Sequence, residues 1–197
     1  RLMASITKGA EQLDQRSSNH PAIATTTEEG TPRPQAAVLT DIGKTHHLFH
    51  DEGGDPFAKV GGGAYLVTGV EYRELLAREY YRLTGKGANR NAIADAVNTL
   101  SAIAKFDGPQ EPVFLRVGEH DGCIVIDGGG SDWGGYIVRP GNWERVDRLP
   151  VHFRRAGKPL PLPKPTAADF SRLWRHVNAT PEHRCMVAGF LLSALRP

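Results

Sequence analysis

Hydrophobic and polar positions change their spacing several times along the chain, and the first stretch has the short apolar runs of β-strands. These runs predict strands near 37–40, 46–50 and 56–60. The glycine-containing segment 51–55 separates the last two and predicts the turn of a hairpin, because glycine reaches positive φ without steric cost.

Two segments then show the 3.6-residue spacing of amphipathic helices. Their apolar positions are Tyr72, Leu75, Leu76, Tyr80 and Leu83 in the first segment and Ile93, Val97, Leu100 and Ala104 in the second. Gly85 is a natural C-terminal stop for the first helix, and Asn89 or Asn91 can cap the second. The link between them is short, which predicts a helical hairpin.

After Gly108 the strand pattern returns. Residues 112–119 and 123–127 predict a β-hairpin, and residues 134–146 predict a second pair of strands that turns at Pro140 and Gly141. Two helices followed by a β-ribbon is also the element order of a winged-helix domain, in which the second helix would lie on DNA. Few cations lie on that helix, so a winged-helix-like part remains the alternative reading.

The C-terminal region is helical again. Thr166 with Asp169 resembles a capping box, and the apolar stripe that follows comprises Phe170, Leu173, Trp174 and Val177. Thr180 and Pro181 predict the start of a second helix over 181–195, which is apolar nearly all round and must therefore be covered. The whole pattern predicts an α+β protein: short antiparallel hairpins, a helical hairpin and a C-terminal helix pair.

Composition adds a segregated charge to this picture. The 197 residues carry a net charge of only +2, yet residues 145–165 hold six cations and one acid. The two cysteines, Cys123 and Cys185, exclude a disulfide framework and fit a reducing compartment. The longest nearly apolar run is too short to span a bilayer, and no secretory signal is visible. We therefore expect a cytoplasmic protein without a membrane partner.

The basic segment is also stiffened by proline. Residues 148–165 contain prolines at nearly every second position after Lys158, which predicts an extended, polyproline-like strap. Its cations are either solvated or in contact with nucleic-acid phosphates. The predicted phosphate contacts are Arg148, Arg154, Arg155 and Lys158 in the strap and Lys86 and Arg90 in the turn between the helices.

No residue pattern predicts catalysis or a metal site. Residues 84–91 lack the full spacing of a P-loop and join two helices, whereas a P-loop follows a strand. His46, His47 and His50 would not converge on one face of a strand. The carboxylates Glu119, Asp121 and Asp127 on one predicted hairpin, and Ser131 in a glycine-rich turn, lack the partners that a nuclease or a nucleophile needs.

Several segments resemble, in the same order, a region of large phage- and plasmid-type proteins of mobile elements. The segments are "LFHDEGGDPFAKV", "REYYRLTGK", "PVFLRVGEHDG", "NWERVDRLPVHFRRAGKPLPLPKP" and "GFLLSALRP". In that family this region immediately precedes a P-loop ATPase that acts as a helicase or primase-helicase module. The resemblance implies that the ATPase motif begins beyond Pro197, that ATP and Mg²⁺ belong to that downstream domain only, and that this chain does not hydrolyse ATP.

The expected organisation has four parts: a polar segment over 1–35, an α+β body over 36–147, the basic strap over 148–165 and a helical pair over 166–197. We expect a non-catalytic accessory module of a mobile-element ATPase or helicase. It would contact nucleic acid, DNA rather than RNA, by neutralising phosphates. The alternative is a protein–protein docking or homo-oligomerisation module, and a metal-dependent nuclease is the third candidate.

Overall fold

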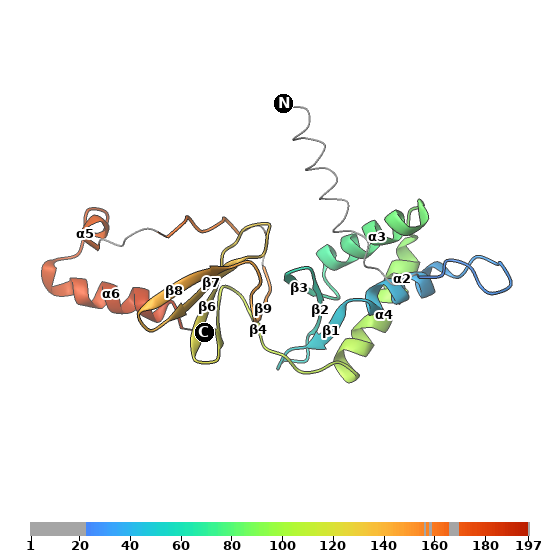
Figure 1. Ribbon diagram of the computed structural model, residues 1–197, viewed down its shortest axis with the longest axis horizontal. Coiled ribbons are helices and arrows are strands. Elements are labelled where there is room, and N and C mark those ends of the chain that lie inside the picture. Colours follow the sequence, from blue (N-terminus) through green and yellow to red (C-terminus); the bar gives the residue numbers. More distant parts are fainter. Residues whose placement is uncertain (1–22, 156, 158, 166–169, 197) are drawn as a thin grey trace, which may run out of the picture. The chain divides into compact units, whose positions relative to one another are not determined.

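In the computed structural model (Figure 1) the described residues are 23–155, 157, 159–165 and 170–196. They form an α+β protein, as the sequence predicts. The chain divides into two compact units, which we call the helical unit (1–50, 54–58 and 66–109) and the sheet unit (51–53, 59–65 and 110–197). The expected body over 36–147 is thus shared between both units, and the strap belongs to the sheet unit. The capping pair Thr166 and Asp169 lies outside the described residues.

The strand expected at 37–40 is wrong, because these residues belong to helix α2, Gln35–Lys44. Val38, Leu39 and Ile42 are buried on one side of it. A helix and a strand both fit a run of four apolar residues, and the helical spacing of Ile42 was the signal that decides between them.

The strands expected at 46–50 and 56–60 are confirmed as β1, His47–His50, and β2, Pro56–Val60. They form a three-stranded sheet in the order β1-β2-β3 with β3, Gly63–Leu66, which the sequence pattern did not predict.

Helices α3, Val70–Thr84, and α4, Arg90–Phe106, are confirmed together with their end signals. Gly85 adopts the left-handed conformation (φ 68°) and its N–H donates to the carbonyl of Tyr81. The Asn89 side chain accepts a hydrogen bond of 2.9 Å from the backbone N–H of Asn91 and so caps α4. These two local signals end one helix and begin the next within five residues.

A buried polar network joins α3 to the segment that precedes β1. His46 Nδ1 lies 3.0 Å from the Tyr72 hydroxyl and Nε2 lies 3.1 Å from a Glu79 carboxylate oxygen. Burial, with the charge of Glu79 adding to it, raises the pKa of Tyr72, so the hydroxyl stays protonated. Each of the two ring nitrogens of His46 therefore has a hydrogen-bond partner inside the unit.

The sheet unit contains two sheets. Strands β5, Val117–His120, β6, Cys123–Asp127, β7, Gly135–Arg139, and β8, Asn142–Val146, form an antiparallel meander in that order, which confirms both expected hairpins. The short strands β4, Val113–Phe114, and β9, His152–Phe153, pair in parallel. The predicted β-ribbon is therefore part of a four-stranded sheet in the second unit, and it is not the two-stranded wing of the winged-helix reading.

The C-terminal region of the sheet unit contains α5, Phe170–Leu173, and α6, Arg184–Ser193, which a 3₁₀ turn at Pro181–His183 precedes. The second helix was predicted to be covered, yet none of the residues of α6 is buried by the described part of the chain. Among the described residues no helix is long and apolar enough to cross a membrane.

Packing between α2 and α4 generates a first prediction, which concerns Gly43. A Cβ atom at Gly43 would lie 2.2 Å from Cδ1 of the fully buried Leu100. We expect Gly43→Ala to lower the free energy of unfolding by about 1–2 kcal/mol, because overpacking outweighs the better helix propensity of alanine. Urea denaturation measures this loss.

The matched control is Gly87→Ala, since a Cβ at Gly87 meets no atom within 4 Å. It should leave the midpoint of urea denaturation nearly unchanged. Equal midpoints for the two variants would contradict the packing argument.

Candidate functional site

The strap is anchored by a buried ion pair between Arg155 and Asp127, the last residue of β6. Arg155 Nε donates to one carboxylate oxygen of Asp127 at 2.8 Å and Nη2 donates to the other at 2.6 Å. Its Nη1 also donates to the Gly130 carbonyl at 2.7 Å. Asp127 is fully buried, so this bidentate pair is shielded from water.

An aromatic ring completes this anchor. The guanidinium carbon of Arg155 lies 3.7 Å from the centroid of the Trp133 ring, which is cation–π geometry. Gly62 and Gly63, at the turn between β2 and β3, permit the close approach of this indole. A Cβ atom at either glycine would lie 2.3 Å from Trp133 atoms. Small residues distant in sequence thus make room for the ring that covers the guanidinium.

Beyond Arg155 the strap lies against the loop that follows β6. The Leu162 N–H donates to the Gly128 carbonyl at 2.8 Å, and Arg116 Nη2 donates to the Leu160 carbonyl at 3.4 Å. A Cβ atom at Gly129 would lie 2.7 Å from the Leu160 carbonyl oxygen, so glycine is needed at this approach. The described part of the strap is therefore a seated element of the sheet unit.

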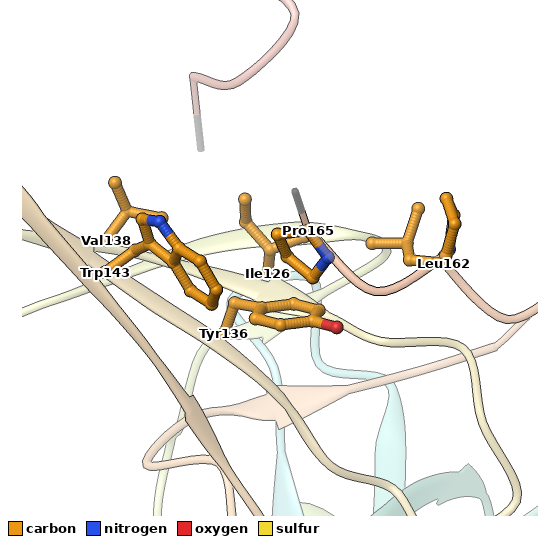
Figure 2. Close-up of a pocket in the computed structure, with 7 residues that line it drawn as sticks. Ile126, Tyr136, Val138, Trp143, Leu162 and Pro165 are labelled. Carbon is orange, nitrogen blue, oxygen red and sulfur yellow. The ribbon is translucent and has the colours of Figure 1, made fainter. Parts of the chain in front are cut away.

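The seated strap forms one wall of an apolar groove, which we call the sheet–strap groove. Its volume is about 250 Å³, and its lining residues are Ile126, Tyr136, Val138, Trp143, Leu162, Pro163 and Pro165. In Figure 2, Tyr136 lies between Trp143 at one end and Leu162 at the other. The rings of Tyr136 and Trp143 meet edge to face at 5.9 Å, and Trp143 is half exposed.

The structure corrects the prediction for Arg155. Its guanidinium is bound to Asp127 and Gly130, so it cannot also hold a phosphate without breaking a buried pair. Arg148 is exposed and Arg154 is half-buried, whereas Lys158 lies outside the described residues. Of the three strap positions that the structure describes, Arg148 is the exposed one.

Another cation of this segment, Arg145, is also held by acids. It forms ion pairs with Asp132 and with Asp147. The backbone N–H of Gly134, with Arg145 adding to it, holds the pKa of Asp132 below its usual value, so the carboxylate stays charged. The excess of cations in residues 145–165 is therefore smaller on the surface than in the sequence.

Lys86 and Arg90, the other predicted contacts, are both exposed at the turn between α3 and α4. Sequence reasoning missed two further exposed cations, Arg78 and Arg82, although they precede Lys86 at steps of four residues on one side of α3. We call these four residues the interhelical basic surface. The one acid between residues 78 and 90 is Glu79, which is only 12% exposed and binds His46.

Among the described residues, His46, His50, Glu119 and Asp127 do not come together in a catalytic cluster. His46 binds Tyr72 and Glu79, while the ring of His50 lies 3.1 Å from the Ala104 carbonyl. Glu119 is opposite Ile124 and so shares a face of the sheet with Ile126, whereas Asp127 points to the other face. The carboxylates therefore do not converge on a metal as a nuclease would require.

The anchor generates the second prediction. Arg155→Met leaves the Asp127 carboxylate buried without its cation, and we expect the free energy of unfolding to fall by about 3 kcal/mol or more. The double variant Arg155→Met with Asp127→Leu should recover much of this loss, because no buried charge remains. Urea denaturation followed by tryptophan fluorescence measures both changes.

Arg139→Met is the matched control, since Arg139 forms an ion pair with Glu144 in which both side chains are nearly half exposed. Its loss of stability should be much smaller than that of Arg155→Met, because an exposed ion pair contributes little. Losses of similar size at the two arginines would show that Arg155 does not anchor the strap.

Comparison with protein-family models, with curated proteins and with solved structures finds no match to this chain. A proposal about its function therefore depends on the residues and the geometry described above.

Proposed function

We propose that this chain is a non-catalytic accessory module that binds nucleic acid by neutralising phosphates, chiefly through the interhelical basic surface. One observation carries the proposal: between residues 78 and 90 every exposed charged side chain is basic, because the single acid, Glu79, is turned inward to His46. A solvated turn of ordinary composition would mix both signs of charge. A concentration of one sign fits a polyanionic partner.

The position of these cations supports phosphate contacts. Arg78 and Arg82 lie one helical turn apart on α3, and Lys86 and Arg90 follow in the turn that joins it to α4. The steps of four residues align the first side chains along one side of the helix. Arginine binds phosphate with a planar fork of donors, which suits contacts to a backbone without reading bases.

We further propose that the module serves a P-loop ATPase or helicase of a mobile element, working on DNA in the cytoplasm. The resemblance of the strap and of the C-terminal helix to the region before such ATPases supports this part. ATP and Mg²⁺ would be bound by that domain. The strap supports a coupling role, because the buried Arg155–Asp127 pair ties it to β6 and its prolines favour an extended backbone.

A second candidate function, protein–protein docking, is favoured by α6. Met186, Phe190 and Leu192 of this helix are each at least 66% exposed. Large apolar side chains that remain this exposed are typical of a surface that a partner covers. The partner would be the downstream ATPase domain or a second copy of this chain.

The third prediction tests nucleic-acid binding. Replacing Lys86 and Arg90 together by glutamine should weaken binding to duplex DNA at low salt. It should also reduce the slope of log Kd against log salt by about two, because each lost phosphate contact removes about one released counterion. Fluorescence anisotropy of a labelled duplex at several salt concentrations measures both quantities.

The matched control replaces Arg73 and Lys105 by glutamine, which removes the same charge from exposed positions of α3 and α4. It should change the slope much less. If both double variants behaved alike, binding would be non-specific. If the chain bound no DNA but assembled in a way that Phe190→Asp abolished, the docking function would replace the proposal.

A further inference from the structure

The four-stranded sheet has one face that the core of its unit does not use. Strand alternation directs Val125 of β6 to the cluster with Val151 and Phe153. Tyr136 and Trp143 point to the opposite face, because Tyr136 is opposite Ile126 and Trp143 is opposite Val138 in the register. The strap covers part of this second face, and the sheet–strap groove lies where strap and sheet meet.

The size of the groove restricts its occupant. A volume of about 250 Å³ is smaller than the volumes of pockets that hold a whole drug-sized ligand, which begin at about 300 Å³. It therefore suits a single flat group more than the side-chain row of an apolar helix. Trp143 is 50% exposed at one end of the groove and offers an indole face for stacking.

Charge around the groove favours an anionic chain. Lys164 is exposed between two lining prolines, and Arg148 is exposed just after β8. Arg145 shares the face of Trp143, two residues along the same strand, and is neutralised by its acids. Glu119, the one acidic strand residue on this face, belongs to β5, at the other edge of the sheet. Lys164 thus places a cation on the strap side of the groove.

We infer that the sheet–strap groove binds one unstacked base of single-stranded nucleic acid. The base stacks on Trp143, and a phosphate that flanks it approaches Lys164. An aromatic platform beside cations is the arrangement by which proteins hold single strands without reading their sequence. A duplex keeps its bases stacked inside and cannot fill the groove. The inference rests on the proposed function and deepens it by naming the strand state that this second surface selects.

The fourth prediction uses Trp143→Leu, a change at a half-exposed position of the edge strand β8. Affinity for a labelled oligothymidine should fall about tenfold, because stacking on the indole is lost. Affinity for a blunt-ended duplex without unpaired bases should not change. Trp143→Phe should retain most of the affinity for the single strand, since an aromatic face remains. Fluorescence anisotropy at fixed salt measures all three.

The matched control is Leu160→Ala, which removes a strap side chain that is 84% exposed and does not line the groove. It should leave both affinities unchanged. If Trp143→Leu bound single strand and duplex as the unchanged chain does, the groove would not be a base site, while phosphate binding by the interhelical basic surface would stand. If neither oligonucleotide bound, both proposals would fail. Single-strand binding that depends on Trp143, together with duplex binding that does not depend on Lys86 and Arg90, would support the groove and overturn the surface at the turn.

One further arm separates the groove from a peptide site. A proline-rich peptide that displaces no oligothymidine would support a base site. A peptide that binds in a Trp143-dependent way, when oligothymidine does not bind, would overturn the inference in favour of a peptide partner.

Discussion

The ion pair between Arg155 and the buried Asp127 fixes the position of the strap in the sheet unit. Arg155 and Asp127 lie 28 residues apart in the chain, yet they form two hydrogen bonds with each other, and the carboxylate is fully buried. Separating them would leave a buried charge, which costs several kcal/mol. The end of β6 and the part of the strap around Arg155 therefore keep a fixed relative position. The sheet–strap groove is lined by both elements, so its shape depends on the same ion pair.

The same pair changes how the charge of the chain is understood. Residues 145–165 look like a polyanion-binding segment because six of them are basic. Two of those cations, Arg145 and Arg155, are neutralised by acids that come from other parts of the sheet unit. The helical turn shows the reverse, since the carboxylate of Glu79 is withdrawn and leaves its neighbours uncompensated. The charge that remains on the surface depends on which carboxylates are buried or paired, and three-dimensional contacts decide that.

Local signals explain which elements the sequence could predict. Gly85 and Asn89 end and begin helices through bonds to residues within four positions, and both signals are correct. The hairpin turn at Asp121 and Gly122, where both residues have positive φ, is local in the same sense. Helix α2 was missed because the decisive residue, Ile42, lies outside the short apolar run that suggested a strand.

The site was less predictable than the fold for the same physical reason. The partners of Arg155 come from the end of a strand and from a loop. Trp133, whose ring lies against the guanidinium, fits there because Gly62 and Gly63 of another hairpin have no side chains. No periodicity along the chain reports such contacts. By contrast, Arg78 and Arg82 were within reach of sequence reasoning, since the spacing of four residues from Lys86 is visible in the printed sequence.

The prolines of the strap have a mechanical consequence. Pro159, Pro161, Pro163 and Pro165 each fix their own φ angle, and the residues before them are restricted too. A chain with so few free torsions shortens and lengthens very little under load. A displacement of the chain at Pro165 would therefore be transmitted along the backbone to β6. A glycine-rich linker would instead absorb such a displacement by changing its own conformation.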